Sequence, residues 1–307
     1  MKEESLLLLS DLQKLINQVV LIDYTIIILG GVGMFRTRVI SSAVLVILAL
    51  VTILGGGYLL AATLLFLALV AYRELMKACK LSGEGKKLSA LEINGYIGIL
   101  AYYLVMVFVP DRIYLFLAVV LILIGFMFIY VFSFPKYHSD QIMSAFFCVA
   151  YAPVMLSFIY LVRELPYGVY TVWMIFISSW ICDTCAYLTG ICIGKHKLAP
   201  ILSPKKSIEG AVGGIMGSAI VGALYGYFVV ESVVVEQSIT WIFVVISAAG
   251  AVISQVGDLA ASAIKRNQEI KDYGKLIPGH GGVMDRFDSV IFTAPMIYFL
   301  TLLLIRA

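Results

Sequence analysis

The stretch RIYLFLAVVLILIGFMFIYVFSF, residues 112–134, has one charged residue, Arg112, at its first position. About 20 predominantly apolar residues are enough for a helix to cross the hydrocarbon core of a bilayer. The apolar residues here form one continuous run, whereas a membrane β-strand shows about ten residues of alternating hydrophobicity. This stretch therefore predicts a transmembrane helix.

The rest of the chain repeats this pattern. Of its 307 residues, 62% are hydrophobic and 13% are charged, against about 25% charged residues in an average soluble domain. Only helices or closed barrels span a bilayer, because every backbone polar group must be satisfied within the protein. We therefore predict an all-α, polytopic membrane protein with about nine transmembrane helices, at approximately residues 38–55, 57–77, 94–110, 112–134, 141–162, 169–193, 209–230, 239–262 and 287–305.

The positive charges divide unequally between the two sets of alternate loops. Sixteen of the 22 lysines and arginines fall in one set, whereas the other set holds only Arg112, Arg163 and Arg306. Loops rich in lysine and arginine stay in the cytoplasm. The distribution predicts a multi-pass protein of the cell membrane with a cytoplasmic N-terminus and an external C-terminus.

Three regions are expected along the chain. Residues 1–33 form an N-terminal extension in which Asp11, Lys14 and Asp23 interrupt the apolar runs. This extension is either an interfacial helix or a segment that precedes the true start at Met34. The predicted regions after it are an N-terminal transmembrane bundle, 34–168, and a C-terminal catalytic transmembrane region, 169–307.

Small residues recur every four positions in the seventh predicted span, at Gly210, Gly214, Ser218, Gly222 and Gly226. Small residues at this spacing let helix backbones approach closely in lipid. They serve either a dimer interface or packing within one subunit, and packing within the subunit is favoured.

Four aspartates lie at the predicted cytoplasmic ends of spans: Asp183, Asp258, Asp285 and Asp288. An aspartate at a helix centre costs about 2.5–3.5 kcal/mol on the insertion scale, so such residues usually bind something or line a wet cavity. Asp285 and Asp288 share one face if the last helix begins near Met284. Their oxygens suit Mg²⁺, although a pair of carboxylates can also simply stabilise a helix N-terminus.

Basic and glycine residues surround these aspartates. Basic side chains and exposed glycine amides neutralise phosphate oxygens, and bound Mg²⁺ bridges them, which is what phosphoryl or nucleotidyl transfer needs. His280 can act as a general base or as a donor to a phosphate, and the donor role is slightly favoured. The residues of this set are Lys265, Arg266, Lys271, His280, Gly281, Gly282 and Arg286.

A second loop, SPKKSIEG at 203–210, has a related composition. Ser203, Lys205 and Lys206 are candidates for contacts with a phosphate, although lysines here also serve as topology signals. Ser207 is expected to cap the seventh helix, whose N-terminus then faces an anion.

The run from Ser262 through Lys265-Arg266, Lys271-Asp272-Tyr-Gly274 and Pro278-Gly-His-Gly-Gly282 to Asp285-Arg-Phe-Asp288 resembles the signature of the phosphatidate cytidylyltransferases. The stretches 183–187 and 203–210 resemble that family as well. The resemblance implies the reaction of CTP with phosphatidic acid to CDP-diacylglycerol and pyrophosphate. It also implies a Mg²⁺-dependent enzyme that is usually a homodimer, with Asp258, Asp285 and Asp288 as metal ligands.

The expected partners are CTP, phosphatidic acid, membrane lipids and a second copy of the chain, and no nucleic acid. Asp183 is expected to complete the polar cavity or to contact the nucleotide. A CTP-dependent enzyme acting on an isoprenoid lipid phosphate or alcohol is an alternative. A transporter is a more distant one, because intramembrane aspartates also mark ion pathways, but the chain shows no clear inverted repeat.

Overall fold

The computed structural model describes residues 43–83, 87–233, 239–277 and 281–305. Within these residues the prediction of an all-α, polytopic membrane protein is confirmed, because eight helical segments are long and apolar enough to cross a membrane. The first predicted span, 38–55, corresponds to a shorter apolar helix, Ala43–Gly55. Its predicted start and the whole N-terminal extension, 1–33, lie outside the described residues.

The elements that follow the helix Ala43–Gly55 are α2 (Gly57–Ala78), α3 (Ala90–Phe108), α4 (Ile113–Phe132), α5 (Ser139–Val149), η1 (Ala150–Val154), α6 (Met155–Arg163), α7 (Gly168–Thr171), α8 (Trp173–Phe176), η2 (Ile177–Ile181), α9 (Cys182–Ile193), β1 (Lys197–Ala199), β2 (Ser203–Ser207), α10 (Ile208–Tyr225), η3 (Gly226–Val230), α11 (Thr240–Asn267) and α12 (Met284–Leu304). Three of the spans contain a π-helical turn; η1 contains a residue near the site described below, and η2 comes just before a residue of that site. Such turns are rare in helices and occur frequently at functional sites.

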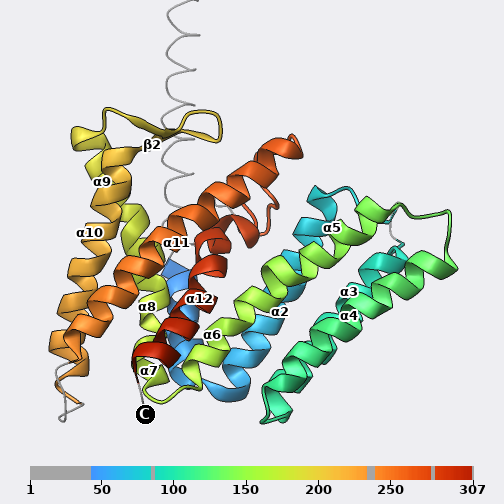
Figure 1. Ribbon diagram of the computed structural model, residues 1–307, viewed down its shortest axis with the longest axis horizontal. Helices are drawn as coiled ribbons and strands as arrows, with labels where there is room; N and C mark the ends of the chain where they lie inside the picture. The colour runs from blue at the N-terminus through green and yellow to red at the C-terminus, as the bar shows by residue number, and fades with distance from the viewer. Residues whose placement is uncertain (1–42, 84–86, 234–238, 278–280, 306–307) are drawn as a thin grey trace, which may run out of the picture.

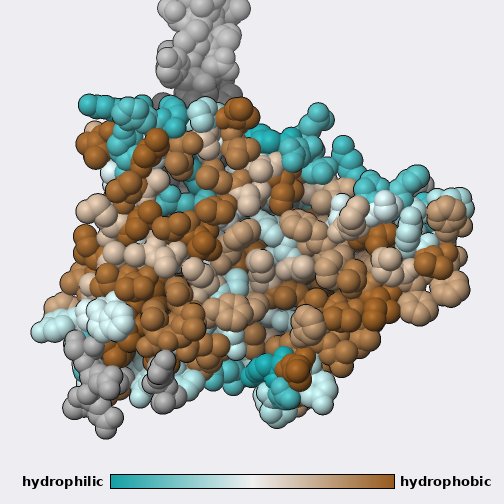
Figure 2. Space-filling view, in the orientation of Figure 1, coloured by the Kyte–Doolittle hydropathy of each residue, from teal (hydrophilic) through white to brown (hydrophobic). Residues whose placement is uncertain are grey.

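The helices lie side by side, with α12 near the middle of the molecule between α11 and α6 (Figure 1). On one side of α12, α11 packs on α10 and α10 packs on α9; on the other, α6 packs on α2. The antiparallel hairpin β1–β2 caps the end of the bundle where α11 ends, and α12 ends at the opposite end. A broad belt of hydrophobic residues separates more hydrophilic regions at the two ends (Figure 2).

Three helix boundaries differ from the predicted ones. α3 begins at Ala90 and not near 94, because Ser89 and Glu92 form a capping box that starts the helix earlier. α11 continues past 262 to Asn267, which places Lys265 and Arg266 in its last turn, where positive charge complements the helix dipole. α12 begins at Met284 and not at 287, so Asp285 lies in its first turn and Asp288 lies at the start of the next turn.

The small residues of α10 pack against neighbouring helices of the same chain. A Cβ atom on Gly213 would lie 2.2 Å from Thr189 Oγ1, and one on Gly217 would lie 2.4 Å from Cys185 Sγ, both on α9. A Cβ atom on Gly222 would lie 2.2 Å from the hydroxyl of Ser247 on α11. The favoured interpretation of the small-residue pattern, packing within the subunit, is therefore confirmed.

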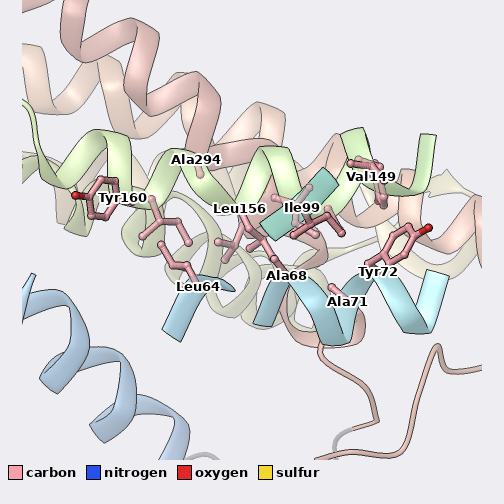
Figure 3. Close-up of a cluster of buried hydrophobic side chains, with 14 of the residues drawn as sticks. Leu64, Ala68, Ala71, Tyr72, Ile99, Val149, Leu156, Tyr160 and Ala294 are labelled. Atoms are coloured by element: carbon pink, nitrogen blue, oxygen red, sulfur yellow. The ribbon is translucent and has the colours of Figure 1, made fainter. Parts of the chain in front are cut away.

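The hydrophobic core joins α2 to the helices that support the site. Leu64, Ala68 and Ala71 of α2 face Leu156 of α6, and Ala294 of α12 lies against the same cluster (Figure 3). All of these side chains are buried. The packing fixes α2 next to α6 and α12, so residues early in the chain reach the site formed by its last third.

Candidate active site

A cavity of about 550 Å³ opens beside the first turn of α12. Its apolar part is lined by the helix Ala43–Gly55 and by α2, α6 and the aromatic pair Phe176 and Trp180. Its polar part is lined by five aspartates and two cations. These polar residues are Asp183, Asp258, Lys265, Asp272, Asp285, Arg286 and Asp288. The cavity thus places charged groups and an apolar surface within reach of a single bound molecule.

Three of the aspartates come from three different helices. Asp183 lies in the first turn of α9, directly after the π-helical turn η2. Asp258 lies on α11, and Asp288 lies one turn into α12. Their negative charges interact with one another across the cavity. The predicted convergence of these side chains is therefore what the fold produces.

Lys206 provides positive charge from the hairpin β1–β2. Its Nζ atom forms an ion pair with Oδ2 of Asp258. Adjacent residues of a strand point to opposite faces, so Lys205, its neighbour in β2, is exposed and does not line the cavity. Glu209 holds the base of the hairpin by accepting hydrogen bonds from the backbone N–H groups of Lys195 and His196.

Asp285 is enclosed by donors. Oδ1 accepts from Lys265 Nζ at 3.0 Å, and Oδ2 accepts from the backbone N–H groups of Tyr273 at 2.9 Å and Gly282 at 3.0 Å. The Asp285 side chain is only 4% exposed. Both of its oxygens are therefore occupied by protein donors in the structure.

Tyr273 supports the same cluster. Its ring lies 5.4 Å from the Lys265 ammonium, within cation–π range, and its hydroxyl donates to the carbonyl oxygen of Ala261. Burial raises the pKa of the Tyr273 phenol well above its usual range. The Tyr151 hydroxyl and the carboxylates of Asp285 and Asp288 raise this pKa further. The phenol therefore stays protonated and remains a hydrogen-bond donor.

Comparisons with known proteins agree with this geometry. Residues 36–304 match the model of the family described as the cytidylyltransferase family. The chain belongs to the cytidylyltransferase family. Similar curated proteins, named phosphatidate cytidylyltransferase, come from Staphylococcus saprophyticus, 31% identical over 270 residues covering 85% of this chain and 97% of the relative, and from Staphylococcus aureus, 33% identical over 279 residues covering 89% and 100%.

Six of the residues predicted from sequence meet in the cavity of this cytidylyltransferase. They are Asp183, Asp258, Lys265, Asp285, Arg286 and Asp288, and Lys206 joins them through Asp258. Gly281 and Gly282 adjoin Asp285, and the positive φ of Gly281, +86°, requires a residue without a Cβ atom.

Other predicted residues lie elsewhere. Ser207 caps α10 as expected, because its hydroxyl accepts from the N–H of Gly210 at 3.1 Å. Ser203 begins β2 and is partly buried. Arg266 and Lys271 are exposed and, like Lys205, do not line the cavity. His280 lies outside the described residues.

Sequence reasoning missed three residues near the site. Asp272 lines the cavity. Tyr151, in η1, is 4% exposed, interacts electrostatically with Asp288 and Asp258, and its hydroxyl finds no hydrogen-bond partner among the residues that the structure describes. The third residue is Glu74 of α2. Its position inside a predicted span is rare for an acid, and this could have marked it as a functional residue from the sequence.

The described residues contain no group of three or more acidic, histidine or cysteine side chains placed to hold a metal ion by themselves. Mg²⁺ usually keeps several waters and binds through one or two carboxylates together with substrate phosphates. Asp258 and Asp288 supply two such carboxylates on facing helices, and their oxygens are the ligand type that Mg²⁺ prefers. This part of the site therefore fits Mg²⁺, whereas the oxygens of Asp285 are already bonded.

Proposed function

We propose that this protein transfers the cytidylyl group of CTP to phosphatidic acid and so produces CDP-diacylglycerol and pyrophosphate. The observation that carries the proposal is a cavity in which a charged end, lined by acidic and basic side chains, adjoins an apolar end. Lys265 and Arg286, together with cations held by the aspartates, can bind a triphosphate at the charged end, and the apolar end can hold the acyl chains of a lipid phosphate. The names of the relatives, phosphatidate cytidylyltransferase, support the same substrates.

The reaction exchanges one phosphorus–oxygen bond for another. A phosphate oxygen of phosphatidic acid forms a bond to the α-phosphorus of CTP, while the bond from that phosphorus to the bridging oxygen breaks. The electron pair of the broken bond leaves with pyrophosphate. The attacking phosphate is already an anion, so the step needs no general base from the protein.

The residues of the cavity have separate roles in this proposal. Lys265 and Arg286 offset the charge that builds on the phosphate oxygens, and Lys206 approaches from the hairpin next to Asp258. Preorganised charges of this kind supply much of the catalysis in phosphoryl transfer. Asp183 completes the polar wall near the nucleotide.

The proposal includes Mg²⁺ held by Asp258 and Asp288. An ion held there would neutralise negative charge on the substrate phosphates. Asp285 supports these ligands indirectly, because its oxygens accept hydrogen bonds from Lys265 and from the backbone N–H of Gly282, just before α12. Removal of divalent cations with EDTA is expected to abolish activity, and added Mg²⁺ is expected to restore it.

We further propose that the site faces the cytoplasm of a cell membrane, because the loops at its end of the bundle contain most of the lysines and arginines. CTP is available on that side. A homodimer, implied by the resemblance to the family, is the proposed assembly. Mass photometry of the purified protein in detergent measures the assembly directly.

The test of the proposed function is an assay with purified protein, radiolabelled CTP, phosphatidic acid and Mg²⁺. CDP-diacylglycerol is the expected product, and an isoprenoid phosphate in the same mixture distinguishes the alternative lipid substrate. Asp288→Asn is expected to lower kcat by about 100-fold or more, as losing one preorganised electrostatic contact does. Asp140→Asn is the matched control, since Asp140 is an exposed aspartate in the first turn of another helix, α5. Wild-type turnover by Asp288→Asn would show that the site is wrongly assigned.

A further inference from the structure

Glu74 on α2 is buried although it lies inside a membrane-spanning helix. Its exposed fraction is 7%, and it contacts residues more than 200 positions later in the chain. Oε1 accepts a hydrogen bond from the N–H of Val283 at 3.1 Å, and Oε2 accepts from the N–H of Met284 at 2.9 Å. A buried carboxylate is costly unless it is well bonded, so these contacts account for its tolerance in the fold.

Two glycines of the C-terminal region are shaped around this carboxylate. A Cβ atom on Gly274 would lie 2.2 Å from Oε1 of Glu74, and one on Gly282 would lie 2.5 Å from both oxygens. Both distances are too short for any real side chain. Gly274 and Gly282 therefore allow the backbone just after Tyr273 and just before α12 to approach Glu74 closely.

Consecutive N–H groups at the start of α12 are shared between two carboxylates. Asp285 takes the N–H of Gly282, and Glu74 takes those of Val283 and Met284. The first N–H groups of a helix have no partner inside the helix, and negative charge is favourable there. Glu74 is thus a capping group supplied from a different helix, and it sets the position of the first turn of α12, which contains Asp285 and is followed directly by Asp288.

We propose that Glu74 is a positioning residue for cytidylyl transfer. It does not line the cavity, so it acts through the first turn of α12 and not by touching substrate. In this role it places Asp288 opposite Asp258 and keeps Asp285 bonded to Lys265. The proposal rests on the proposed function, because it assigns Glu74 to the same reaction.

The first experiment replaces Glu74 with glutamine, which keeps the size of the side chain but sets an NH₂ group against a backbone donor. The expected result is a fall in kcat of roughly 10–100-fold, the usual effect of removing a group that supports active-site ligands, with the KM for CTP changed less than threefold. Arg73→Gln is the matched control, because Arg73 is the exposed neighbour on the same helix. Wild-type kcat in Glu74→Gln would overturn the proposal.

A second pair of variants separates positioning from a general loss of folding. Gly282→Ala places a methyl group against the Glu74 carboxylate, and Glu74→Asp withdraws that carboxylate by one methylene. If the two positions act together, the double variant Glu74→Asp/Gly282→Ala is more active than Gly282→Ala alone. A double variant no more active than Gly282→Ala would count against the proposal.

Hydrogen–deuterium exchange gives a measurement that does not depend on activity. The amides of Val283 and Met284 are expected to exchange faster in Glu74→Gln than in wild-type protein, while amides in α4 stay unchanged. Unchanged protection of those two amides would overturn the proposal even if the wild-type protein made no CDP-diacylglycerol. If the wild-type protein were inactive but these amides exchanged faster in the variant, the proposed function would be contradicted, whereas the contact of Glu74 with the start of α12 would be supported.

Discussion

The Nζ atom of Lys265 lies 3.0 Å from Oδ1 of Asp285, and this ion pair joins the last turn of α11 to the first turn of α12. The two side chains are 15% and 4% exposed. Removing one partner of a buried pair leaves an uncompensated charge, which costs about 3–5 kcal/mol. The ion pair therefore stabilises the packing of α11 against α12 and also fixes the position of Asp285 in the site.

Lys265→Met is accordingly expected to lower the midpoint of thermal unfolding in detergent, because it leaves the buried Asp285 carboxylate without its positively charged partner. The double variant Lys265→Met/Asp285→Asn removes the charge as well and is expected to recover part of the loss. Arg266→Met is the control, since Arg266 is the exposed neighbour in the same turn. A double variant whose loss equals the sum of the two single losses would contradict a direct interaction.

The transmembrane helices were predictable because lipid demands long, continuous apolar segments. Their ends were less so: the α3 boundary depends on the capping box of Ser89 and Glu92, and the length of α11 depends on its basic last turn. The aspartates of the cavity were predictable because acids inside spans are rare. The family resemblance then provided the chemistry, which hydropathy does not contain.

Contacts between distant parts of the chain were not predictable. Glu74 meets Val283 only because α2 packs beside α6 and α12. Asp285 was expected to bind metal, and its bonds to Lys265, Tyr273 and Gly282 depend on how the segment before α12 folds back. The different directions of Lys205 and Lys206 follow from a short hairpin that an apolar pattern does not reveal.

That difference between adjacent lysines leads to a prediction about CTP binding. Lys206→Gln removes the cation beside Asp258 and is expected to raise the KM for CTP by about tenfold or more, because a hydrogen bond to a charged group is worth about 1.5–3 kcal/mol. Lys205→Gln is a control in the same strand, and its KM is expected to stay within twofold of wild type. Steady-state kinetics at saturating phosphatidic acid measure both. Equal effects of the two substitutions would mean that only the overall charge of the hairpin matters.

Tyr151 provides the last prediction, because its buried hydroxyl has no hydrogen-bond partner among the described residues and lies near the charges of Asp288 and Asp258. An unpaired buried donor costs stability, so Tyr151→Phe is expected to leave the unfolding midpoint unchanged or slightly higher. The ring remains packed against Phe292, 5.8 Å away between centroids. We expect this hydroxyl to donate to a substrate phosphate bound beside the two aspartates. Turnover is then expected to fall by about tenfold or more in Tyr151→Phe, since a hydrogen bond to a charged group is worth about 1.5–3 kcal/mol.

Tyr103→Phe is the matched control for this experiment. Tyr103 is as buried as Tyr151, but its hydroxyl donates to the carbonyl oxygen of Pro153 at 3.1 Å. Its removal is expected to lower the unfolding midpoint and to leave kcat close to wild type, the reverse of the pattern for Tyr151. Parallel thermal unfolding and CDP-diacylglycerol assays on the two variants measure this reversal. If Tyr151→Phe lost stability and kept its turnover, the hydroxyl would be a structural group and not part of the site.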